Sequence, residues 1–120
     1  MPKLRRTAAA AIASLVLVAG LWLPAQGAVV VNARHVGASY RWRPATTTVM
    51  HGTQITWKAV QGSHTVQSYG GNWTYHRSLA SGAMVSRAFR TRGTFKFFCQ
   101  VHGYLIGATC YGMCGKIVVT

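Results

Sequence analysis

The hydrophobic positions of the chain follow two patterns, one near the N-terminus and another through the rest. Apolar residues extend without a charge from residue 8 to residue 23, directly behind three basic residues. From Ala28 onward, apolar residues occur in short segments that Gly, Asn and Ser interrupt at intervals of roughly ten residues. This change predicts a leader followed by a single small domain.

Residues 1–27 have the order of a secretory signal peptide. The basic start and the apolar run are followed at residues 24–28 by the small residues of a cleavage site, with cleavage after Gly27 or Ala28. An uncleaved membrane anchor is the alternative, but an apolar run of 16 residues is short for a spanning helix. We expect residues 28–120 to work as an exported domain, periplasmic or extracellular, with no stable membrane span once the leader is removed.

The rest of the chain shows the alternation typical of β-strands and little helical periodicity. Residues 85–90 alternate apolar and polar side chains, and residues 94–98 do the same. Five further runs also predict strands, at residues 29–31, 46–49, 55–60, 65–68 and 116–120. Pro44 belongs at a sheet edge or at the start of a strand, because proline cannot donate to a central ladder. The pattern predicts an all-β sandwich or barrel.

Several side chains have no sequence context that indicates a functional site. Five are expected to pack inside the domain: Trp57, Phe89, Phe97, Met50 and Met84. Three histidines are expected on the surface or in loops: His35, His51 and His76.

The charge of the chain is entirely of one sign. It contains 13 Lys or Arg and no Asp or Glu, and removal of residues 1–27 takes away three of these cations and leaves ten. The missing carboxylates exclude glycosidase and aspartic-protease pairs, Ser-His-Asp triads and carboxylate sites for calcium. The positive charge predicts attraction to acidic proteins or anionic surfaces that weakens with salt. No dense basic block is present, so nucleic acid is not an expected partner.

The residues able to carry chemistry lie mainly near the C-terminus. Cys99 and His102 follow a predicted strand, and Met113 comes eleven residues after His102 and directly before the last strand. His64 lies far upstream, at the start of another strand. Two imidazoles, one thiolate and one thioether form the ligand set of a mononuclear copper centre, in which soft sulfur selects copper.

In these stretches the chain resembles the cupredoxins, the small blue copper proteins that include plastocyanin, pseudoazurin and amicyanin. The most specific match is residues 93–102, which carry the family's Cys and second His. Residues 63–66 match the surroundings of the first His, and residues 112–119 are similar to the axial Met and the closing strand. The early strand pair is matched by residues 42–44, 48–52 and 55–57.

The resemblance implies a cupredoxin-like Greek-key β-sandwich over residues 28–120. It implies one copper ion at a type 1 site, with His64, Cys99 and His102 in the trigonal plane and Met113 on the axis. The implied function is transfer of single electrons by a monomeric carrier that is not an enzyme. Its redox partner is expected to have an acidic surface, such as a cytochrome or a copper oxidase domain. Copper storage or delivery is an alternative, as is a cationic secreted binding module with a degenerate site.

Two positions depart from the family pattern. Thr53 stands where an acidic residue is common, which we interpret as a surface change. The interval between His102 and Met113 is longer than usual, and residues 103–112 either displace the axial Met or bulge outward; we favour the bulge because residues 112–119 keep the family pattern.

The three cysteines leave one odd thiol, which suggests a functional role for it. Cys99 is the natural ligand, and Cys110 and Cys114 are close enough in sequence to pair with each other if the loop curls back, which is a hypothesis. A structural zinc site from Cys99, His102, Cys110 and Cys114 is an alternative, but it leaves His64 unexplained. A dinuclear copper centre is disfavoured because no His follows Cys114.

Overall fold

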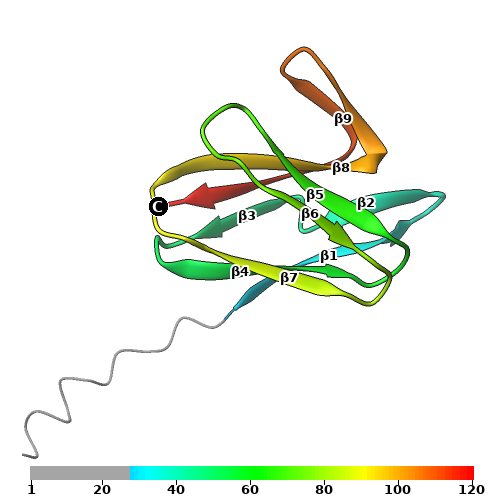
Figure 1. Cartoon of the computed structure of the whole chain (residues 1–120), viewed down its shortest axis with the longest axis horizontal. Coiled ribbons are helices and arrows are strands. Elements are labelled where there is room, and N and C mark those ends of the chain that lie inside the picture. The colour runs from blue at the N-terminus through cyan, green and yellow to red at the C-terminus, as the bar shows by residue number, and fades with distance from the viewer. Residues whose placement is uncertain (1–27) are drawn as a thin grey trace, which may run out of the picture.

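The structure is a computed structural model that describes residues 28–120, arranged as two packed β-sheets (Figure 1). Residues 1–27, which include the predicted signal peptide, lie outside the described residues. The strands of the described part are β1 (Val29–Val36), β2 (Ser39–Arg43), β3 (Thr46–Val49), β4 (Thr53–Ala59), β5 (His64–Tyr69), β6 (His76–Leu79), β7 (Met84–Phe89), β8 (Gly93–Ile106) and β9 (Thr109–Val119). No helix among these residues has the length and apolar character needed to span a membrane.

The two sheets have four and five strands. The first has the order β2-β1-β4-β7 and the second the order β3-β9-β8-β5-β6. Neighbours are antiparallel except for the parallel pairs β1–β4 and β3–β9. The predicted all-β sandwich is therefore confirmed.

The chain crosses from one sheet to the other between β2 and β3, which are edge strands of different sheets. Pro44 lies at this crossing, and the Arg43–Pro44 peptide bond is cis. The position agrees with the expectation for Pro44, because a proline between two edge strands removes no donor from a central ladder.

The alternation of side chains decides which residues the sheets enclose. In β5, His64, Val66 and Ser68 are buried and alternate with partly exposed neighbours. All seven predicted runs lie in or overlap strands of the structure. The strands β2 and β6 were not predicted, because β2 alternates arginines with aromatic residues and β6 contains a single aliphatic residue.

Aromatic rings fill the space between the sheets. Phe97 is fully buried, and its ring centroid lies 5.6 Å from that of Trp42 and 5.4 Å from that of Trp57. Trp57 also makes an edge contact with Phe89, at 6.2 Å between centroids. These T-shaped arrangements suit the quadrupoles of the rings. The core positions predicted for Trp57, Phe89 and Phe97 are confirmed.

The prediction that Met50 and Met84 pack in the core is wrong, since their side chains are 58% and 61% exposed. Met84 shares the outer face of β7 with Ser86 and Ala88. Met50 follows the buried Val49 and continues the alternation of β3 to the outside.

Replacing Phe97 with Ala is expected to lower the free energy of unfolding by about 3–5 kcal/mol, because the ring is enclosed and the cavity cannot collapse onto two fixed tryptophans. Urea unfolding followed by tryptophan fluorescence measures the change. The matched control Met84→Ala, at an exposed position, should change stability by less than about 0.5 kcal/mol. Equal effects of the two substitutions would contradict the core assigned to Phe97.

Candidate metal centre

The ladder between β8 and β9 is interrupted once, at the segment that carries two of the predicted ligands. Between two successive paired positions, β8 supplies four residues, Cys99 to His102, and β9 supplies only Met113. The sequence predicted a loop here after the strand at residues 94–98. The structure instead continues β8 to Ile106 and accommodates the extra residues as an enlarged bulge.

Two glycines allow the backbone to close around this bulge. Gly112 has a φ of +85°, and a Cβ atom there would lie 2.5 Å from the carbonyl oxygen of His102. A Cβ atom on Gly103 would lie 3.0 Å from the backbone nitrogen of Met113. Glycine is therefore required at residue 112 for both its conformation and its close contact.

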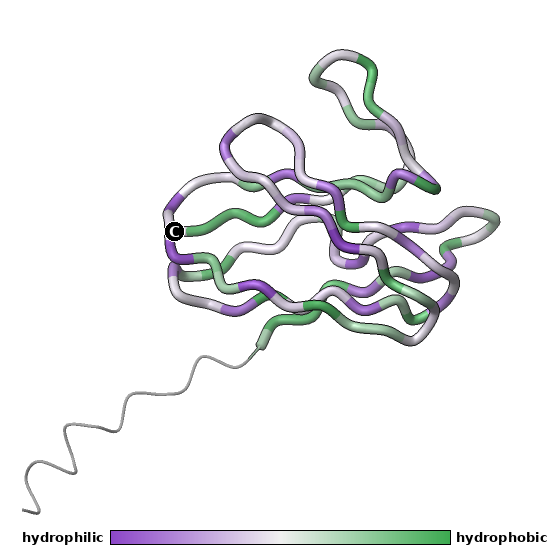
Figure 2. Tube along the Cα trace, viewed as in Figure 1, coloured by the Kyte–Doolittle hydropathy of each residue, from purple (hydrophilic) through white to green (hydrophobic). Residues whose placement is uncertain are grey.

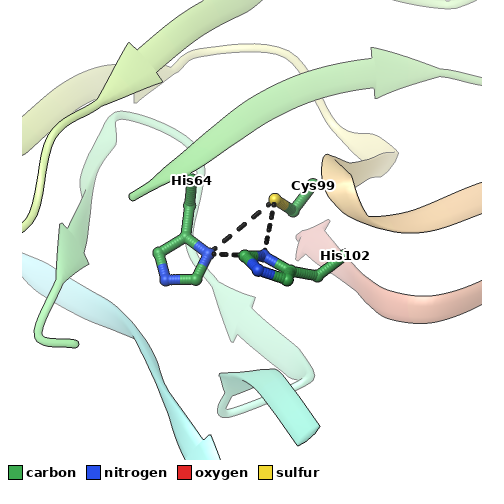
Figure 3. A group of neighbouring side chains, drawn as sticks. All are labelled: His64, Cys99 and His102. Atoms are coloured by element: carbon green, nitrogen blue, oxygen red, sulfur yellow. Dashed lines mark hydrogen bonds between the residues drawn. The ribbon is translucent and has the colours of Figure 1, made fainter. Parts of the chain in front are cut away.

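The bulge brings Cys99 and His102 close to His64, the first residue of the neighbouring strand β5 (Figure 3). The Nδ1 atoms of the two histidines are 3.1 Å apart, and the Cys99 Sγ atom lies 3.8 Å from Nδ1 of His64 and 3.6 Å from Nδ1 of His102. A point equidistant from these three atoms is about 2 Å from each, close to the bond lengths of a first-row transition metal with nitrogen and sulfur. Three of the four predicted ligands therefore surround a space of the right size.

The orientation of His64 leaves the correct nitrogen available. Its Nε2–H donates a hydrogen bond to the carbonyl oxygen of Gln61 at 2.6 Å. A carbonyl only accepts, so the proton of the neutral ring lies on Nε2 and the lone pair lies on Nδ1. This nitrogen points at Cys99 and His102, and the outer hydrogen bond holds it there.

The sulfur of Cys99 is fully buried and receives a backbone donor. The N–H of Thr65 points at Sγ at 3.4 Å, and the N–H of Gln100 donates to Oγ1 of Thr65 at 2.8 Å. The first contact stabilises negative charge on the sulfur, and the second joins the bulge to β5. These contacts of Thr65 were not predicted, since a threonine beside a histidine is common in any strand.

An aromatic residue that sequence analysis also missed covers the two imidazoles. The ring of Tyr40 lies 4.8 Å from that of His64 and 4.4 Å from that of His102. The ring of His35 is also near Tyr40, with 3.9 Å between the ring centroids. Tyr40 is two residues before the buried Trp42 in β2, so period-two spacing from Trp42 is the signal that could have placed it on the inner side.

The environment also keeps His102 neutral. Burial lowers the pKa of this imidazole from its ordinary value, and the nearby rings of His64 and His35 lower it further. The neutral ring is the form that binds metal, and His102 itself is only partly buried.

Met113 is fully buried in the cluster that also contains Cys99. It is the single residue of β9 that faces the bulge, so the long segment after His102 leaves it beside the site. Residues 103–112 form the outer part of the β8–β9 hairpin, which agrees with the prediction that this segment projects outward. The role of Met113 as a fourth ligand stays a prediction.

Cys110 and Cys114 form a disulfide, with 6.1 Å between their Cα atoms. The predicted pairing is confirmed, and Cys99 is the free cysteine of the described residues. The zinc alternative is excluded in this oxidised form, because two of its three thiol ligands, Cys110 and Cys114, are joined to each other.

A two-sheet sandwich that brings two histidines and a cysteine together is typical of small copper-binding proteins. Solved structures of such proteins have the same fold as this chain. The chain has the cupredoxin fold. A purple cupredoxin from Nitrosopumilus maritimus is 18% identical, with a TM-score of 0.59 over 77% of this chain and 99% of the other. A pseudoazurin from Methylobacterium extorquens is 20% identical, with a TM-score of 0.59 over 78% and 75%.

An oxidised amicyanin variant is 23% identical, with a TM-score of 0.61 over 81% of this chain and 86% of the other. No protein-family model and no curated protein sequence matches the chain. The likeness therefore establishes the fold, and the donor set of His64, Cys99 and His102 is what fits a single copper ion.

Replacing Gly112 with Ala is expected to destabilise the bulge more than Gly107→Ala, its matched control. Both glycines have positive φ, but a Cβ atom at Gly107 meets nothing within 4 Å. The control should lose about 1–2 kcal/mol from backbone strain alone, whereas G112A must also displace the carbonyl of His102. Urea unfolding of the metal-free protein measures both, and equal losses would contradict the close approach at Gly112.

Proposed function

We propose that residues 28–120 form a blue copper protein that carries single electrons between redox partners outside the cytoplasm, after removal of residues 1–27. The observation that supports this function is the triangle of two imidazole nitrogens and one buried sulfur. When bound, copper supplies a one-electron couple between its cuprous and cupric states. The chain itself offers no carboxylate for acid-base catalysis, which favours a carrier over an enzyme.

The role of the fold in this proposal is to hold the donor atoms still. His64 begins β5 and Cys99 lies in β8, and these strands are paired within one sheet. Thr65 joins the two segments through its hydroxyl, and Gln61 anchors the far side of the His64 ring. Donors held in this way change little when charge is gained or lost, so little reorganisation opposes electron transfer.

The thiolate and the thioether have different proposed roles. Cys99 supplies the strong sulfur donor, and the N–H of Thr65 moderates its negative charge. Met113 would supply a weaker thioether donor from β9, because it is buried and faces the bulge.

The proposed route for the electron is through His102. This ring is partly exposed, whereas His64 and Cys99 are buried. A partner that docks over this end of the sandwich reaches His102 first. The ten cations of the described residues favour a partner with an acidic surface, such as a cytochrome or a copper oxidase domain.

Addition of cupric ion to the purified protein is expected to produce an intense visible thiolate-to-copper band. Cys99→Ser should abolish this band because it removes the sulfur, and His64→Gln should strongly weaken it. His76→Gln is the matched control, since His76 is an exposed histidine on β6 away from the site. Visible and paramagnetic spectra measure the result, and a colourless wild-type sample would reject the proposed centre.

Met113→Leu is expected to raise the reduction potential and to keep the visible band. The substitution preserves most of the volume and removes a donor that stabilises the cupric state more than the cuprous state. Protein-film voltammetry measures the shift, and Met84→Leu provides the exposed methionine control. An unchanged potential in M113L would show that Met113 does not bind the ion.

Electron exchange with an acidic cytochrome is expected to slow several-fold as ionic strength rises, because salt screens the attraction between opposite charges. Stopped-flow measurements over a salt series test this. A rate indifferent to salt would contradict the acidic partner, and copper transfer to a metal-free acceptor without redox cycling would favour copper delivery instead.

A further inference from the structure

The β8–β9 hairpin beyond the bulge projects from the sandwich and contributes no donor atom to the triangle. Its strands pair from Gly103–Gly112 outward, and Figure 1 shows its tip standing apart from both sheets. The side chains along it are mainly apolar or aromatic, and hydrophobic colour follows one arm of the hairpin in Figure 2. Exposed fractions are 57% for Tyr104, 36% for Leu105, 62% for Ile106 and 45% for Tyr111.

The hairpin is held in one conformation. The rings of Tyr104 and Tyr111 stack across the strands with their centroids 5.5 Å apart. Gly107, at a φ of +59°, provides the first position of the two-residue turn, and the Cys110 disulfide ties the second strand to the sandwich end of β9. An apolar surface that is ordered in advance loses little conformational entropy when it binds.

Charge is distributed so that the hairpin has none. No charged residue occurs between Lys96 and Lys116, while the described residues carry ten cations and no acid. An uncharged apolar tip can enter a membrane interface without burying an ion. The cationic body behind it is attracted to an anionic surface as a whole.

Two of the cations lie directly opposite each other on the outer face of the four-stranded sheet. Arg34 of β1 and Arg41 of β2 are directly opposite each other in the antiparallel pair, on the face away from the buried Ala33 and Trp42. Like charges in this arrangement repel, and the chain has no carboxylate side chain to neutralise them, so an external anion stabilises the pair.

We propose that the β8–β9 hairpin is a membrane-docking element that inserts its tip into the interface of an anionic phospholipid bilayer. Leu105 and Ile106 enter the acyl boundary, the two tyrosines lie at headgroup level, and the cationic body, which includes the Arg34–Arg41 pair, is attracted to the anionic surface. A projecting aliphatic tip flanked by tyrosines suits a fluid interface. A protein partner would require a matching cavity, and the hairpin has no charged group to set its register there.

Membrane docking by the hairpin does not depend on copper, but it would bring the candidate metal centre close to the membrane surface. Cys99 and His102 lie at the base of the hairpin, so insertion of the tip holds them beside the membrane surface. A carrier held in this way moves between membrane-bound partners in two dimensions.

The test uses the full chain with vesicles of equal parts phosphatidylglycerol and phosphatidylcholine. Co-sedimentation should show that the double substitution Leu105→Ser with Ile106→Ser lowers the partition coefficient by about tenfold, as two exposed aliphatic side chains are lost. Met84→Ser is the matched control, because Met84 is 61% exposed and Ile106 is 62% exposed. Arg34→Gln with Arg41→Gln should weaken binding to these vesicles and remove part of its salt dependence.

Hydrogen exchange distinguishes membrane binding by the hairpin from membrane binding by residues 1–27. Amides of residues 103–111 should exchange more slowly when anionic vesicles are added and should not respond to pure phosphatidylcholine. Unchanged exchange in the hairpin, or equal partitioning of the tip variant and M84S, would overturn the proposal. So would a dimer in sedimentation velocity that only the tip variant abolishes, since the occupant would then be a second copy. Near-UV circular dichroism confirms that each variant is folded.

Discussion

The mismatch between four residues of β8 and one residue of β9 is the constraint on which the rest of the structure depends. Pairing is regular up to Phe98–Cys114 and resumes at Gly103–Gly112, so the intervening residues of β8 must leave the ladder. Their departure turns Cys99 and His102 toward the same space. The two paired ends keep the bulge in place, because neither side can slip without breaking the register of the whole hairpin.

The absence of carboxylates shapes both the interior and the surface. The buried sulfur of Cys99 has an amide donor instead of an ion pair, and the donor triangle contains only imidazole and sulfur. On the surface, cations rest on aromatic rings: Arg87 lies 5.2 Å from the centroid of Trp73, and Arg77 lies 5.2 Å from that of Tyr75. The cations therefore have no side-chain carboxylate within the chain to pair with.

The sequence predicted much of the fold because strand alternation is a local property. Residues 94–98 alternate because one face of β8 meets the core, and that pattern is readable without knowing the partner strand. Met84 shows the limit of this reasoning, since an apolar side chain in a strand can occupy either face. Strand β2 was not predicted because it is short and Trp42 is its single buried residue.

The sequence by itself determined the available chemistry: one unpaired thiol, histidines in two separated segments and no acid, which together leave little besides a sulfur-imidazole metal site. Only the tertiary structure decided the geometry in which His64, Cys99 and His102 converge and the position of Tyr40 over the imidazoles. The physical reason is range. Side-chain type and alternation are encoded residue by residue. Convergence instead requires β5 and β8 to pair, so that His64 meets Cys99 from 35 residues away, and requires the bulge to form against β9.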